Sequence, residues 1–103
     1  MKTLLAITIT LFAGTPAFAA GDAAAGEGKA GACIACHGID GIATSPTFPN
    51  LAGQNAPYIV AQLKALKSGE RKGAQSAIMA AQAANLSEQD MEDLAAYFSS
   101  LGK

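Results

Sequence analysis

The residues best suited to chemistry are the only two cysteines of the chain, Cys33 and Cys36, and its only histidine, His37, which follows them directly. A Cys-x-x-Cys-His run is typical of the attachment site of a c-type haem. Two thiols three positions apart on a helical turn can both add to the vinyl groups on one side of a porphyrin, and the adjacent imidazole can then reach the iron. The spacing therefore predicts one covalent haem, with His37 as an iron ligand.

Two other kinds of site use cysteines at this spacing. A thiol–disulfide couple is one, but a redox Cys-x-x-Cys motif normally accompanies a βαβ pattern, and no segment of this chain alternates convincingly as a strand. A zinc site is the other, but the chain offers neither a second cysteine pair nor a second histidine. Haem attachment is the favoured interpretation, and a thiol–disulfide oxidoreductase is the weaker alternative.

Residues 1–19 have the features of a signal peptide. Lys2 precedes an apolar run from Leu4 to Phe12, and the triplet 17–19 (Ala-Phe-Ala) has the small residues that signal peptidase accepts. The run is shorter than the roughly 20 residues needed to span a bilayer, so an uncleaved anchor and stable membrane insertion are not expected. We predict cleavage before Ala20, export to the periplasm, and one domain over residues 20–103.

The composition of the chain agrees with a small domain built around a cofactor. It has no tryptophan, 6% aromatic residues and a formal net charge of −1, so no basic excess suggests nucleic-acid binding. Domains of this size bury a small fraction of their surface and often need a disulfide, a metal or a cofactor for stability. A cofactor that supplies part of the core is therefore expected.

Three helices are predicted to position the motif in an all-α domain. Asp22 is a suitable N-cap for a first helix over about residues 22–35. Asn55 begins a second, which Gly69 ends. Ser87 begins a third helix, which carries an apolar face. Residues 38–54 are predicted to form a loop, and residues 70–86 show no clear periodicity.

Together with further motifs, the haem motif makes the chain resemble a class I cytochrome c of the short bacterial kind, close to the cytochrome c-four and c-five group. In the order of that family, the chain has Cys-x-x-Cys-His-Gly, then residues 49–54 (Pro-Asn-Leu-Ala-Gly-Gln), a downstream methionine and residues 93–97 (Asp-Leu-Ala-Ala-Tyr). The match covers essentially all of residues 20–103. The resemblance implies a small cytochrome c fold, in which three main helices and loops wrap around one covalent haem c.

The resemblance also implies individual roles. The Pro49 carbonyl would accept a hydrogen bond from the His37 imidazole, and Leu51 would pack on the haem. Met79 would be the second axial ligand, since His/Met ligation is typical of electron carriers of this family. Met91, by contrast, lies on the apolar face of the third predicted helix and is assigned to the core.

Two smaller features concern the surroundings of the haem. Tyr97 and Phe98 match the terminal helix that crosses the first helix near Gly26 in the family, and a structural role is expected for them. Four cations could form a docking patch for an acidic partner, although a solvated helix face is the more common explanation: Lys64, Lys67, Arg71 and Lys72. The sequence does not decide whether Gln54, Tyr58 and Gln62 reach the haem propionates.

The implied function is single-electron transfer in the periplasm, between respiratory complexes such as a quinol–cytochrome c reductase and a terminal oxidase or reductase. An enzyme is not expected, because His37 and Met79 would fill both axial positions and leave none for a substrate. A haem-based gas sensor is the main alternative, and it requires the iron–Met79 bond to be labile.

Overall fold

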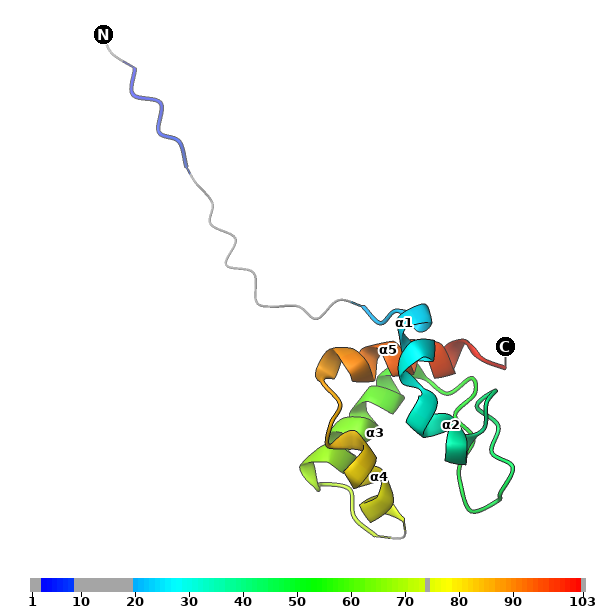
Figure 1. Cartoon of the computed structure of the whole chain (residues 1–103). Coiled ribbons are helices and arrows are strands. Elements are labelled where there is room, and N and C mark those ends of the chain that lie inside the picture. The colour runs from blue at the N-terminus through cyan, green and yellow to red at the C-terminus, as the bar shows by residue number, and fades with distance from the viewer. Residues whose placement is uncertain (1–2, 9–19, 74, 103) are drawn as a thin grey trace.

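The computed structural model describes residues 3–8, 20–73 and 75–102, and within them it contains five helices and no strand. The helices are α1 (Ala23–Lys29), α2 (Gly31–His37), α3 (Ala56–Ser68), α4 (Ser76–Ala83) and α5 (Glu88–Ser100), arranged as in Figure 1. The prediction of an all-α domain is confirmed. Of the predicted signal peptide, only residues 3–8 are described; the remainder, up to the predicted cleavage point, lies outside the described residues. In the described part of the chain, no helix is long and apolar enough to cross a membrane.

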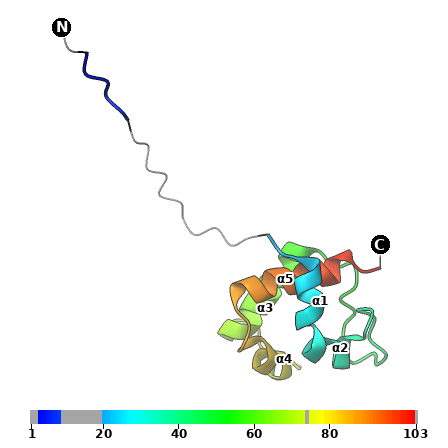
Figure 2. The ribbon, with the colours of Figure 1, turned by 45° about the horizontal axis from the view of Figure 1, so that its top comes forward.

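The first predicted helix is in fact two helices that meet at Ala30. Asp22 caps α1 as predicted, since its Oδ1 accepts a hydrogen bond of 2.9 Å from the Ala24 N–H. Ala30 closes α1 and opens α2 with φ −81° and ψ −2°, next to the poor helix former Gly31. The Ala30 side chain is buried, so this bend lies against the core. It directs α2 away from α1 (Figure 2).

Residues 70–86, whose sequence shows no clear periodicity, contain the helix α4 over Ser76–Ala83. This helix has eight residues, four of them alanine, and its N-cap residue Gln75 makes no side-chain capping bond. A helix so short, without a cap signal and nearly uniform in hydrophobicity, gives no period for sequence analysis to detect. Ala83 is nevertheless fully buried, and α4 packs mainly on α3.

The other predicted helix ends agree with the structure. Asn55 Oδ1 accepts a 3.1 Å hydrogen bond from the Tyr58 N–H at the start of α3, and Gly69 ends that helix with a left-handed φ of 79°. Ser87 and Asp90 form the reciprocal capping box of α5, at 2.9 and 3.0 Å. These helix ends are determined locally, which explains why the sequence alone predicted them.

α1 lies directly across α5 (Figures 1 and 2). A Cβ atom at Gly26 would overlap the Asp93 carbonyl oxygen and lie 2.8 Å from the Cβ of Tyr97. The helices can therefore approach this closely only because residue 26 has no side chain. The adjoining core contains Ala30, Ile59, Val60, Leu94, Ala95 and Phe98.

A buried carboxylate ties α1 to α5 beside this crossing. Asp93 is 4% exposed; its Oδ1 accepts from the Asp22 N–H and from Gln89 Nε2, both at 2.9 Å, and its Oδ2 accepts from Lys29 Nζ at 2.6 Å. Lys29 also pairs with Asp90 at 2.9 Å. Hydrogen bonding from Lys29, followed by that from the Asp22 N–H, lowers the pKa of Asp93 to about 2. Hydrogen bonding to Asp93, followed by that to Asp90, raises the pKa of Lys29 above its ordinary value.

The crossing predicts opposite effects for two glycines of α1. Gly26→Ala should lower the free energy of unfolding of the haem-containing protein by about 1–3 kcal/mol or more, because the new methyl group meets α5 backbone. A Cβ atom at Gly28 would have no neighbour within 4 Å, so Gly28→Ala should be neutral or stabilising by up to about 1 kcal/mol through helix propensity. Urea unfolding followed by circular dichroism measures both. Equal stability of the two variants would show that the crossing does not require Gly26.

The lowered pKa of Asp93 predicts how stability depends on pH. An unfolded aspartate has a pKa of about 3.9. The stabilisation from ionised Asp93 is therefore fully present above about pH 4 and is lost as the pH falls towards about 2. Asp93→Asn should lower the melting temperature at neutral pH and flatten its fall between about pH 4 and pH 2. Glu92→Gln, which removes the neighbouring carboxylate without touching Lys29, is the control. An unchanged acid profile in Asp93→Asn would contradict this assignment.

Candidate functional site

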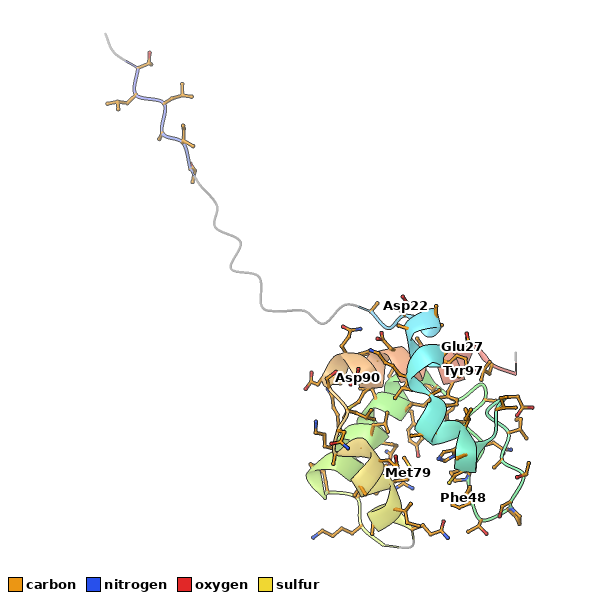
Figure 3. The ribbon with its side chains drawn as sticks, viewed as in Figure 1. Asp22, Glu27, Phe48, Met79, Asp90 and Tyr97 are labelled. Atoms are coloured by element: carbon orange, nitrogen blue, oxygen red, sulfur yellow. The ribbon has the colours of Figure 1, made fainter. Side chains whose placement is uncertain are left out.

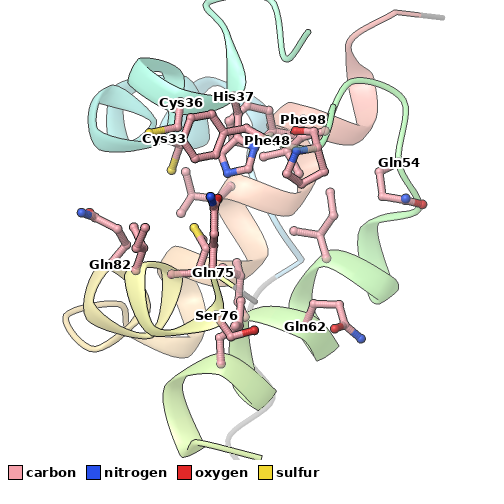
Figure 4. A pocket seen from close by; sticks show the side chains of 18 of the residues that line it. Cys33, Cys36, His37, Phe48, Gln54, Gln62, Gln75, Ser76, Gln82 and Phe98 are labelled. Carbon is pink, nitrogen blue, oxygen red and sulfur yellow. Dashed lines mark hydrogen bonds between the residues drawn. The ribbon is translucent and has the colours of Figure 1, made fainter. Parts of the chain in front are cut away.

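A cavity of about 560 Å³ lies between α2, the loop around residues 47–51, α3, α4 and α5. Its walls are mainly apolar and include side chains that are buried or pack against the core: Leu51, Ile59, Leu63, Leu66, Leu94 and Phe98. All four predicted site residues line it as well: Cys33, Cys36, His37 and Met79. The structure thus brings together residues up to 46 positions apart in the sequence around one space (Figure 4).

Cys33 and Cys36 come from α2 and lie on one side of the cavity (Figure 4). One helical turn separates them, so both thiols reach the same wall. Burial raises the pKa of the Cys33 thiol above its ordinary value. Redox-active Cys-x-x-Cys pairs instead have a cysteine with a lowered pKa, because the thiolate is the nucleophile. The buried environment of Cys33 therefore does not favour a thiol–disulfide oxidoreductase.

His37 is the last residue of α2 and is only 4% exposed. Its Nδ1 lies 2.8 Å from the carbonyl oxygen of Pro49. A carbonyl can only accept, so Nδ1 donates the hydrogen bond, and in the neutral imidazole Nε2 then keeps its lone pair for a metal ion. Such a bond also fixes the ring and increases the basicity of the ligating nitrogen. The His37–Pro49 contact implied by the family resemblance is thus present.

The loop after His37 depends on glycine. Gly38 has φ 90°, and a Cβ there would overlap the Ile42 carbonyl oxygen. The chain then folds back so that the N–H groups of Leu51 and Ala52 both donate to the Gly41 carbonyl, at 2.8 and 3.0 Å. This closed loop brings the Pro49 carbonyl to the imidazole. It also places the Phe48 ring edge-on to His37, with 6.5 Å between the ring centroids.

The two methionines of the domain occupy different environments. Met79 lies on α4 and lines the cavity; Figure 3 shows it across from the loop that carries Phe48. Met91 lies on α5, is 1% exposed, and is not among the residues that line the cavity. The assignment of Met91 to the core is confirmed by this burial.

The residues around the cavity fit a covalent haem. Two thiols lie on one wall, an imidazole has an available Nε2, a thioether comes from a different helix, and the rest of the lining is largely apolar. An imidazole and a thioether are the donor pair found in haem electron carriers, and apolar walls suit a porphyrin. All of these groups line one cavity, as a single porphyrin held by them would require.

Part of the cavity lining was not found from the sequence. The cavity is lined by three residues whose position the sequence left open: Gln54, Tyr58 and Gln62. It is also lined by four residues that were not considered as lining residues: Phe48, Arg71, Gln75 and Gln82. Gln75 and Gln82 belong to the region around α4, which showed no periodic signal. The position of Arg71 depends on how the chain turns after α3, and local sequence patterns do not specify that turn.

The four cations considered as a docking patch do not act as a unit. Lys64 lies 3.8 Å from a carboxylate oxygen of Glu88, and Lys67 Nζ donates to the Leu86 carbonyl at 2.5 Å. Arg71 donates to Gln62 at 3.1 Å. Three of the four cations therefore have separate partners on separate elements. This arrangement agrees with a solvated helix face better than with a single docking patch.

These features define an all-helical domain that holds a covalent haem with a histidine at the end of its cysteine motif. Comparison with known proteins agrees: residues 19–102 match the family described as cytochrome c, and the chain belongs to that family. It therefore carries covalently bound haem c and is an electron carrier.

Individual relatives support this assignment. The chain is 53% identical to cytochrome c-554(548) of Halomonas halodenitrificans over 81 residues, which cover 79% of this chain and 98% of that protein. It is 46% identical to cytochrome c4 of Stutzerimonas stutzeri over 105 residues, covering 96% of this chain and 50% of the relative. The crystal structure of reduced cytochrome c4 from Pseudomonas stutzeri superimposes with a TM-score of 0.69 at 48% identity, covering 80% of this chain and 46% of that one. The chain thus spans almost all of the first relative and about half the length of cytochrome c4.

Proposed function

We propose that the protein is a periplasmic carrier of single electrons, whose haem c is attached through Cys33 and Cys36 and ligated axially by His37 and Met79. The observation that carries this proposal is that all four side chains line a single cavity, although Met79 comes from a helix remote in sequence from the other three. The bound haem supplies the one-electron couple.

The protein's own residues determine how that couple behaves. The bond from His37 Nδ1 to Pro49 holds the imidazole in one tautomer and one orientation, as hydrogen-bond partners commonly do for a histidine that ligates a metal. A thioether from Met79 would favour the ferrous state and raise the reduction potential. The apolar walls restrict water around the site, which reduces the rearrangement that accompanies a change of charge.

Two axial protein ligands leave no open position on the iron, so we propose electron transfer without enzymatic turnover. A gas sensor would need Met79 to leave easily. Electron donors and acceptors of the respiratory chain, such as a quinol–cytochrome c reductase and a terminal oxidase or reductase, are the proposed partners. Residues 1–19 are proposed to be a signal peptide, and residues 20–103 the exported cytochrome c domain.

The mass of the purified protein tests attachment and export together. We expect a polypeptide that begins at Ala20 and carries one haem that survives denaturation. Cys33→Ser and Cys36→Ser should each weaken covalent retention, because each removes one thioether, and the double variant should lose covalent haem and fold poorly. Mass spectrometry of the periplasmic and membrane fractions measures the N-terminus and the attached haem. Circular dichroism of the purified variants measures folding. A membrane-bound chain that retains residues 1–19, or a double variant that stays cooperatively folded without haem, would refute these assignments.

The two methionines provide a matched test of axial ligation. Met79→Ala should lower the reduction potential, remove the sulfur-to-iron charge-transfer band of the oxidised protein, and allow the reduced protein to bind carbon monoxide. Met91→Leu should cost less than about 1.5 kcal/mol of stability and leave the spectrum unchanged, because it is a near volume-conserving core substitution. Visible spectroscopy and redox titration measure these effects.

Two outcomes would contradict the ligand assignment, and a third would favour a different function. Loss of the band in Met91→Leu with its retention in Met79→Ala would exchange the roles of the two methionines. Retention of the band in both variants would mean that the ligand is a different residue. Rapid binding of carbon monoxide by the unmodified reduced protein would favour the gas sensor.

A further inference from the structure

Arg71 is the one lysine or arginine, among the described residues, whose side chain lines the large cavity. Its Nη1 donates to Gln62 Oε1 at 3.1 Å, and Gln62 lines the cavity as well. Within the described chain the ion pairs involve Lys29 and Lys64, and no carboxylate pairs with Arg71. A guanidinium has five N–H donors, so most of them stay available to an acceptor from outside the polypeptide.

The backbone fixes where Arg71 lies. Gly69 ends α3 in a left-handed conformation, and the Arg71 N–H then donates to the Ala65 carbonyl at 3.0 Å. These contacts turn the chain back beside the helix it has just left. The guanidinium thereby returns along α3 to Gln62, two turns before Gly69.

The chemistry of the haem indicates what Arg71 would meet. The two vinyl groups lie on one half of the porphyrin and the two propionates on the other half. Cys33 and Cys36 lie on one side of the cavity, while Gln54 and Gln62 lie on the opposite side (Figure 4). Attachment of the vinyl half at the cysteines turns the propionate half towards the wall that contains Gln62 and Arg71.

We propose that Arg71, oriented by Gln62, binds a carboxylate of the haem propionates. This inference rests on the proposed attachment through Cys33 and Cys36 and deepens it by assigning the opposite end of the haem. A guanidinium suits this task because its planar donors match a carboxylate in a two-pronged hydrogen bond. Its positive charge beside the haem favours the ferrous state, so Arg71 would raise the reduction potential through the propionate.

Arg71→Gln and Lys72→Gln make a matched pair, because each removes one positive charge at adjacent exposed positions and only Arg71 lines the cavity. Redox titration of the haem-containing proteins should show a ferrous-to-ferric ratio about fivefold lower in Arg71→Gln at a fixed potential, or roughly 40 mV at 59 mV per tenfold change. Lys72→Gln should change this ferrous-to-ferric ratio much less. With haem labelled by ¹³C at the propionate carboxyls, the infrared carboxylate band should change in Arg71→Gln alone.

Controls separate this proposal from the ligation of the iron. Covalent haem and the charge-transfer band of the unmodified protein are measured first, and their absence would overturn the proposed function itself. Given both, the Arg71 proposal is overturned if the two variants shift the potential equally, or if the propionate band stays unchanged. It is also overturned if Arg71→Gln loses the charge-transfer band, since Arg71 would then act on the position of Met79.

Discussion

The contact between α1 and α5 at Gly26 is the constraint on which the rest of the structure depends. The absence of a side chain at Gly26 sets the separation of the two helices, and the buried Asp93 carboxylate ties them together through Lys29 and the Asp22 N–H. α2 follows α1 after the bend at Ala30, so this crossing determines where the cysteine motif begins. α5 in turn supplies Leu94 and Phe98 to the cavity wall. A single helix crossing therefore places the attachment motif relative to the apolar surface that must cover the porphyrin.

The chain has few large side chains for its core, and a haem in the cavity would supply the missing apolar volume. The core includes two alanines, Ala30 and Ala95, among its six central buried residues, and the sequence contains no tryptophan. A domain of about 80 residues buries a small fraction of its surface and often needs a cofactor for stability, and this one has a cavity of about 560 Å³ beside its core. A covalently held porphyrin fills such a space with rigid apolar surface at no further cost in binding entropy once attached. The same group that carries the electron thus completes the core, and so stability and function are expected to be lost together when attachment fails.

The sequence predicted the parts of the fold and site that adjacent residues specify. The Cys-x-x-Cys-His spacing, the caps at Asp22, Asn55 and Ser87, and the stop at Gly69 each depend on interactions within a few positions. The His37–Pro49 bond came instead from family resemblance. What the sequence could not predict depends on tertiary contacts: the bend at Ala30, the short uncapped α4, and the Lys29–Asp93 contact across 64 positions. The start of α4 at Gln75, the polar residue Gln82 within it and the turn after α3 that carries Arg71 belong to this second group, which explains why these three lining residues were missed.

The proposed axial ligands are supported very differently by the fold. His37 ends a helix, is buried, donates to a loop carbonyl, and is followed by a glycine turn that closes on itself. Met79 lies on a short helix without a side-chain cap, which packs mainly on α3. After that helix, Lys67 Nζ bonds to the Leu86 carbonyl and joins the connection to α5 back to α3. The histidine side of the haem is therefore positioned by several interlocking contacts, whereas the methionine side depends on how firmly one helix is held. With Met79 as the proposed sixth ligand, the iron would accept a gas only when that residue leaves. The packing of α4 on α3 is then the property of this fold that would favour an electron carrier over a gas sensor.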